Sequence, residues 1–186
     1  MSTVTWRRIV IALAAVAVVI SGVAVAVRFF MHPTAGSAPA ATSALPPGFP
    51  DLDGLTDVSQ AHEVSHHYAL ATFTSPTGLQ CAMWSSRGDT AAFCYGTIPG
   101  LDHPANQVYA GDYKAHFDQK GPPAADKLNG KPLASGEKVI LGAGGKLMGG
   151  DQITCGVQGV VVACVLTRKS AQHHGFVLDP QRSWTF

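Results

Sequence analysis

Two histidines that flank a glutamate form the motif with the most specific chemistry in this chain. His62-Glu63-Val64-Ser65-His66 matches the pattern H-E-x-x-H. On a helix, two histidines at this spacing bind zinc, and the glutamate acts as general base toward the zinc-bound water. A hydrolytic site also needs a third protein ligand, and the residues that follow do not continue as H-x-x-G-x-x-H. The motif therefore predicts only an alternative function, a zinc-dependent hydrolase with Glu63 as base and His62 and His66 as ligands.

Two other interpretations of this motif stay open. His62, His66 and His67 would bind metal adventitiously if all three were accessible, or they are ordinary exposed histidines near the edge of the domain. We favour the exposed histidines, because little more than ten residues separate the motif from a linker and a zinc helix needs structure on both sides. On that interpretation the chain has no catalytic residue and no metal or other cofactor.

Two further pairs of residue types are suited to proton transfer. Asp102 stands beside His103, and Asp112 lies four residues before His116. General acid–base catalysis uses such groups, but neither pair has an activated nucleophile beside it in a recognisable motif. We expect all four to be solvated loop residues.

The cysteines form two pairs that are close in sequence: Cys81 with Cys94, and Cys155 with Cys164. Their spacing contains no C-x-x-C, which makes a structural zinc site a poor alternative. An even number of cysteines in an exported domain predicts disulfides. Between Cys81 and Cys94 lies a polar, glycine-containing turn, so these two residues are expected on the arms of one β-hairpin.

The second cysteine pair has a predicted register. If residues 158 to 161 make the bend of a hairpin, Val157 faces Val162 and Cys155 faces Cys164. Directly opposed residues point to the same face of the sheet, as a cross-strand disulfide requires. The sequence therefore predicts two local disulfides, Cys81–Cys94 and Cys155–Cys164.

An uncharged apolar run from Ile9 to Val27 predicts the cellular location of the domain that carries these residues. About twenty such residues cross the ~30 Å hydrocarbon core of a bilayer as one helix. Arg7 and Arg8 precede the run and Arg28 alone follows it, which favours a cytoplasmic N-terminus and an extracytoplasmic remainder. The competing interpretation is a cleaved secretory signal, in which residues 1–40 are removed and the domain is secreted.

The predicted organisation of the chain has four parts. They are a cytoplasmic N-terminus (1–8), a transmembrane helix (9–30), a Pro/Ala-rich linker (31–50) and an extracytoplasmic β-rich domain (51–186). Three of the thirteen Lys and Arg flank the apolar run, which leaves ten against twelve Asp and Glu, a net charge of −2. Without a basic face, nucleic acid is not an expected partner. The expected partners are the cell membrane through residues 9–30 and an envelope protein, glycan or lipid.

The residue pattern of the domain predicts a series of short strands with little helix. This pattern predicts a mainly β fold, a small antiparallel domain stapled by disulfides. One short helix is expected running toward His67 and another near Tyr113–Gln119. The expected strands are 68–74, 79–85, 90–95, 107–110, 138–141, 153–157, 160–167, 175–179 and 184–186.

Several segments in this domain form a recognisable set. They include Phe49-Pro50-Asp51-Leu52-Asp53-Gly54, Ser75 to Cys81 (SPTGLQC), Thr154-Cys155-Gly156-Val157 and the ending from Gly175 to Phe186 with its GFVL, Pro, Ser-Trp and final Phe. In order and spacing the chain resembles small membrane-anchored or secreted actinobacterial proteins, chiefly mycobacterial ones. The resemblance implies an exported domain with two local disulfides and carries over no catalytic residue. We therefore expect a single-pass anchored domain with a noncatalytic binding or envelope-structural role.

Overall fold

The computed structural model describes residues 44–65, 69–86, 89–120, 130–142 and 151–186. The predicted transmembrane helix and most of the predicted linker lie outside the described residues. Contacts divide the chain into residues 1–41 and 42–186, and all described residues belong to the second unit. Within the described part, no helix combines the length and the hydropathy that a membrane span requires.

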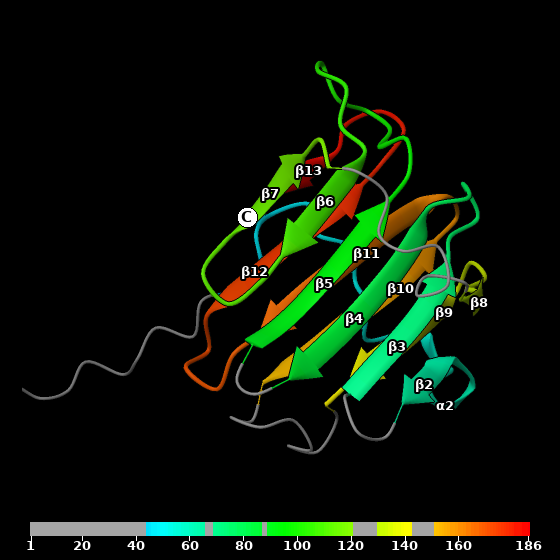
Figure 1. Ribbon diagram of the computed structural model, residues 1–186, viewed down its shortest axis with the longest axis vertical. Coiled ribbons are helices and arrows are strands. Elements are labelled where there is room, and N and C mark those ends of the chain that lie inside the picture. Colours follow the sequence, from blue (N-terminus) through cyan, green and yellow to red (C-terminus); the bar gives the residue numbers. More distant parts are fainter. Residues whose placement is uncertain (1–43, 66–68, 87–88, 121–129, 143–150) are drawn as a thin grey trace, which may run out of the picture. The chain divides into compact units, whose positions relative to one another are not determined.

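The described unit consists of two β-sheets with one short helix, α2 (Ser59–His62) (Figure 1). All strand pairs are antiparallel except β1 with β9 and β3 with β8. The six-stranded sheet has the order β1 (Thr56–Asp57), β9 (Glu137–Leu141), β10 (Gln152–Gln158), β11 (Val161–Thr167), β12 (His173–Leu178), β13 (Trp184–Thr185). The seven-stranded sheet has the order β2 (Glu63–Ser65), β3 (Ala69–Thr74), β4 (Gln80–Ser86), β5 (Asp89–Tyr95), β6 (Gln107–Ala110), β7 (Ala115–Asp118), with β8 (Lys131–Pro132) beside β3.

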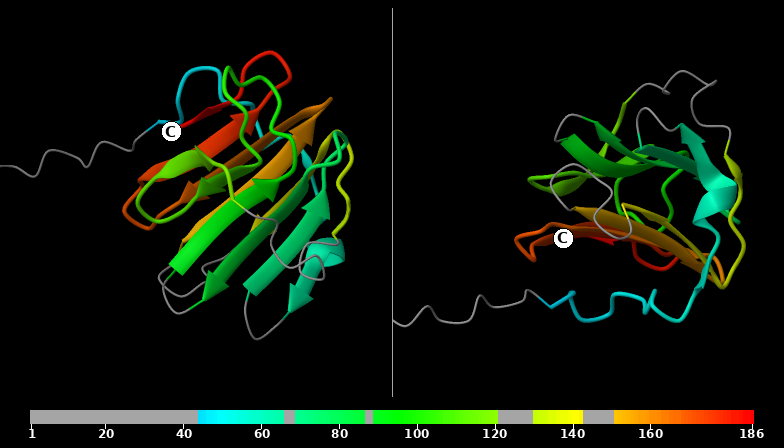
Figure 2. Two further views of the ribbon diagram at one scale, coloured as in Figure 1. Left: turned by 45° about the horizontal axis from the view of Figure 1, so that its top comes forward. Right: turned by 90° about the horizontal axis from the view of Figure 1, so that it is seen from below.

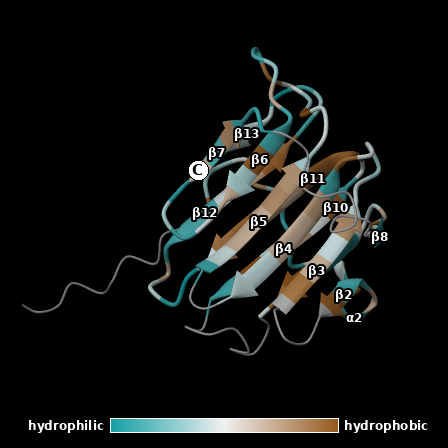
Figure 3. Cartoon of the chain, in the orientation of Figure 1, coloured by the Kyte–Doolittle hydropathy of each residue, from teal (hydrophilic) through white to brown (hydrophobic). Residues whose placement is uncertain are grey.

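The two sheets stack face to face as a sandwich (Figure 2). Side chains alternate between the two faces of a strand, so every second residue points into the space between the sheets. Phe73 from one sheet and Phe176 from the other are both fully buried in a single core cluster. In Figure 3 strands such as β3 carry both brown and paler stretches, as expected where inward and outward side chains alternate.

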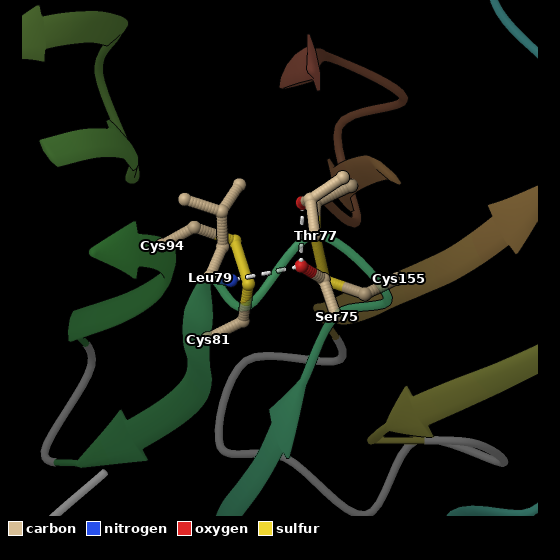
Figure 4. The surroundings of a disulfide bond; sticks show 7 residues. Ser75, Thr77, Leu79, Cys81, Cys94 and Cys155 are labelled. Carbon is tan, nitrogen blue, oxygen red and sulfur yellow. Dashed lines mark hydrogen bonds between the residues drawn. A yellow bond between two sulfur atoms is a disulfide. The ribbon is translucent and has the colours of Figure 1, made fainter. Parts of the chain in front are cut away.

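Both predicted disulfides are present, and both lie in that core. Cys81 pairs with Cys94 across β4 and β5, and Cys155 pairs with Cys164 across β10 and β11. All four cysteines are at most 1% exposed. Figure 4 shows the first bridge together with Cys155 of the opposite sheet. The predicted register of the second hairpin is confirmed at every position.

A segment at the start of the domain, residues 44–55, covers the outer face of the six-stranded sheet (Figure 2). We call this segment the strap. Leu52 is buried in a second apolar cluster with residues of β11 and β12, and the Phe49 ring lies 5.5 Å from that of Phe186 in an edge-to-face contact. The Nζ of Lys138 donates to the carbonyl oxygens of Leu52 and Asp53. The strap is therefore part of the folded domain from Phe49 onward, two residues before the predicted start of the domain.

One helix prediction is wrong, and a second is correct in the presence of a short helix and wrong in its extent. The segment expected as a helix near Tyr113–Gln119 contains strand β7, because Ala115–Asp118 pairs with β6 over its whole length. The helix expected to run toward His67 ends at His62, because Glu63–Ser65 pairs with the edge of β3 as strand β2. In both places pairing with a strand outweighs local helix propensity.

Gly175 marks the closest approach inside the six-stranded sheet. A Cβ atom there would lie 2.4 Å from the carbonyl oxygen of Cys164 and 2.6 Å from the ring of Phe186. We expect Gly175→Ala to lower the free energy of unfolding by about 3 kcal/mol, because the added methyl displaces Phe186 and strains β12 where it pairs with β11. Urea unfolding followed by tryptophan fluorescence measures this loss. Gly54→Ala, where nothing lies within 4 Å of the new Cβ, is the matched control and should change stability little; equal losses in both variants would contradict the packing account.

Candidate functional site

The residues of the H-E-x-x-H motif do not share a helix. His62 is the last residue of α2 and is 5% exposed, and its Nδ1 donates to the carbonyl oxygen of Thr72 at 3.1 Å. Glu63 begins strand β2, and His66 lies outside the described residues. The expectation of an exposed histidine is therefore wrong for His62. Its side chain is buried at the edge of the sandwich, beside β3. Among the described residues no group of three His, Cys, Asp or Glu is arranged to hold a metal ion; zinc binding stays a prediction.

Asp102 and His103 are exposed, as expected, and they line an open groove of about 460 Å³. One wall comes from the loop between β5 and β6, and the other comes from Phe117 and Asp118 at the end of β7. The loop is held against β7 by Asn106, whose side chain both donates to the carbonyl oxygen of Lys120 and accepts from its N–H. The groove is lined by Leu101, Asp102, His103, Pro104, Ala105, Phe117, Asp118 and Gln119.

The groove has an apolar floor and a polar rim. Leu101 and Phe117 are half-buried and pack against the sandwich core. A hydrogen bond from Lys120 holds the pKa of Asp118 below its usual value, and the two side chains form an ion pair at 3.1 Å. Asp118 is therefore a carboxylate near neutral pH, on the same rim as Asp102. A floor of this kind accommodates the apolar face of a small ligand, while the rim accepts hydrogen bonds from hydroxyl or amine groups.

Within the described part of the chain, the second proton-transfer pair, Asp112 and His116, has no hydrogen bond through Asp112 Oδ1 or His116 Nδ1. His116 lies on β7, and its ring centroid is 5.5 Å from that of Tyr109 on β6. Asp112 lies in the turn before β7 and is only 8% exposed, so the expectation of a solvated residue is wrong. The turn is held against the opposite sheet by Arg168, whose Nη1 donates to the carbonyl oxygen of Asp112 at 2.9 Å. Asp112 Oδ1 and His116 Nδ1 are buried atoms without a hydrogen-bond partner among the described residues.

The sequence analysis predicted functional residues on one wall of the groove and none on the other. Asp102 and His103 stand next to each other and attract attention as a pair, whereas Phe117 and Asp118 lie in a segment expected to be a helix. The signal for the second wall is the alternation in β7, where Phe117 packs inward and His116 and Asp118 occupy the other face. Recognising that period as a strand would have placed Asp118 at the sheet edge.

Comparison with known proteins adds no relative. No family model, no curated protein and no solved structure matches the chain. The resemblance to actinobacterial exported proteins therefore stays a prediction.

Proposed function

We propose that the chain is a single-pass, membrane-tethered domain on the extracytoplasmic side of the cell, with a noncatalytic binding role. The observation that carries this proposal is the burial of two disulfides in one core, one bridge in each sheet. Structural disulfides form and persist in oxidising compartments. The apolar run from Ile9 to Val27 supports the tether, and its flanking arginines support a cytoplasmic N-terminus.

The location is tested by a reporter fused behind Phe186 in the full chain. Alkaline phosphatase at this position should be active, because the enzyme matures only after export. Green fluorescent protein at the same position should not fluoresce, because it does not fold correctly when it is exported in the unfolded state. The four cysteines of the native, unreduced protein should resist alkylation after denaturation. A fluorescent cytoplasmic fusion, or four free thiols, would refute the proposed location.

The groove beside β7 is the binding surface that the geometry favours within this role. Its apolar floor of Leu101 and Phe117 and its carboxylates Asp102 and Asp118 match a ligand with both a carbon-rich face and hydroxyl donors. Sugar rings have this combination, which favours a glycan among the possible envelope partners. The volume of about 460 Å³ lies in the range of small-ligand sites.

We expect a neutral oligosaccharide such as cellotriose or N-acetylated chitotriose to shift amide NMR signals of residues 101–105 and 117–119. Asp102→Asn should weaken binding about tenfold, because a hydrogen bond to a charged acceptor is lost. Asp53→Asn, an exposed carboxylate on the strap, is the matched control and should leave the affinity unchanged. Signal shifts confined to other surfaces, or equal effects of the two variants, would refute this groove as the site.

The zinc hydrolase is tested in the same preparation by measuring bound zinc. One zinc per chain, retained in Glu63→Gln with loss of hydrolytic activity, would replace the noncatalytic role by the enzymatic one. A metal-free protein whose binding is unchanged by Glu63→Gln supports the noncatalytic role.

A further inference from the structure

Asp112 occupies an unusual position for a carboxyl group in a turn. It is the second residue of the β6–β7 turn, which is closed by a hydrogen bond from the N–H of Gly111 to the carbonyl oxygen of Lys114 at 3.0 Å. The Tyr109 side chain covers this turn, since a Cβ atom on Gly111 would lie only 2.5 Å from its ring and hydroxyl. Asp112 is more than nine-tenths buried, and its Oδ1 has no hydrogen-bond partner in the described part of the chain.

The same turn connects the two sheets at one end of the sandwich. Arg168 follows β11 of the six-stranded sheet, and its guanidinium donates to the main-chain oxygen of Asp112 in the seven-stranded sheet. Arg168 is itself fixed in a tight turn, because its N–H donates to Gln172 and its carbonyl oxygen accepts from Ala171. The contact therefore joins two turns, each held by its own hydrogen bonds.

Charged groups from several elements face the Asp112 carboxyl. Burial raises its pKa most strongly, and the negative charges of Asp89 on β5 and Asp151 before β10 raise it further. The positive charge of Arg168 and a hydrogen bond from the main-chain N–H of Thr90 act in the opposite direction without outweighing burial. Asp151 is also buried, and its Oδ1 accepts from the N–H of Lys169.

The phenol of Tyr109 is affected by the same charges. Burial raises the pKa of Tyr109, and the negative charges of Asp89 and Asp112 add to that increase. Tyr109 therefore stays neutral wherever Asp112 titrates.

We propose that the corner formed by Asp112, Arg168, Asp89 and Asp151 is a proton-operated clamp between the two sheets, closed when the Asp112 carboxyl is protonated and loosened when it is ionised. The neutral carboxyl tolerates burial and is not repelled by Asp89 and Asp151. The ionised carboxyl leaves a buried charge with one unpartnered oxygen, which favours opening of the turn to water.

The direction of the pH effect follows from the raised pKa of Asp112. A group whose pKa is higher in the folded than in the unfolded protein contributes stability that is fully present below the unfolded value of 3.8 and is lost as pH rises through the folded value. Asp57 and Asp118 have lowered pKa values and act in the opposite sense, losing stability as pH falls. The clamp is thus distinguishable from the ordinary acid response of the domain.

The clamp adjoins the groove in sequence: the turn that contains Asp112 leads directly into β7, whose residues Phe117 and Asp118 line the groove. A pH effect on ligand binding rests on the proposed function, whereas the clamp itself does not. Its test therefore uses no ligand, so that failure of the clamp and failure of the binding role give separate results.

The test measures local opening by hydrogen exchange of the purified, oxidised domain, corrected for the intrinsic pH dependence of exchange. In the wild type, raising the pH from 4 to 8 should increase the opening of the amides of residues 107–118 about tenfold. A change of this size is typical of an unpaired buried acceptor. In Asp112→Asn this increase should vanish, and in the control Asp53→Asn it should remain. An increase that persists in Asp112→Asn would overturn the clamp.

A second measurement needs no variant. The carboxyl carbon signal of Asp112 in the wild-type protein reports its titration directly by NMR. A midpoint above the ordinary aspartate value supports the clamp, and a midpoint at or below that value overturns it. This measurement keeps the proposal falsifiable even if Asp112→Asn fails to fold.

Discussion

Replacing both Cys155 and Cys164 with alanine is expected to lower the free energy of unfolding by about 3 kcal/mol. The two cysteines are nine positions apart in the sequence. In the chain-entropy model, closing a loop of about ten residues destabilises the unfolded chain by about 3 kcal/mol. Both sulfurs are fully buried in the core, so their loss also removes packing. Urea unfolding of the oxidised wild type and the double variant measures the difference.

The matched comparison is Cys81→Ala with Cys94→Ala, whose separation of thirteen residues predicts a similar loss. Removing all four cysteines should leave too little stability for folding at 37 °C, because small domains have only about 5–15 kcal/mol in total. Burial should also protect both bridges from reducing agents until the domain unfolds. A double variant that loses less than about 1 kcal/mol would contradict the interior position of its disulfide.

Phe73→Ala is expected to lower the free energy of unfolding by about 4 kcal/mol. The ring is fully buried between the sheets, and truncation of a buried aromatic side chain leaves a cavity that the surrounding strands cannot fill. The backbone of Phe73 is itself closely packed, since a Cβ atom on Gly130 would lie 2.2 Å from the Phe73 main-chain nitrogen. Calorimetry or urea unfolding measures the loss.

Phe93→Ala is the matched control for this prediction. Phe93 lies in the same sheet, and its partly exposed side chain alternates with the inward-facing Ala92 and Cys94. The same chemical change on the outer face should cost about 1 kcal/mol or less. Equal losses in the two variants would show that the space between the sheets is not the main core.

Asp112 and the groove show which parts of the candidate sites could be predicted. Asp102 and His103 were identified because they are adjacent in the chain, and a solvated loop was the correct expectation for them. Asp112 has the same local character, yet it is buried, because Arg168 from the other sheet holds its turn. No pattern around residue 112 encodes a contact with a residue 56 positions away.

Local sequence was sufficient for the short strands from β3 to β6 and from β9 to β12, and for both disulfides. Alternating side chains and turn residues within about twenty positions determine a hairpin and its register, so Val157 faces Val162 and Cys155 faces Cys164. The tertiary structure alone decided that the strap covers the outer face of the six-stranded sheet and that Asp112 is buried. At Ala115–Asp118 the alternation of four residues is too short a signal to outweigh the helix expectation, and pairing with β6 decided for the strand. Each of these features depends on surfaces that exist only after distant strands have paired and the two sheets have stacked, and the free energy of burying them exceeds the weak conformational preferences of the local chain.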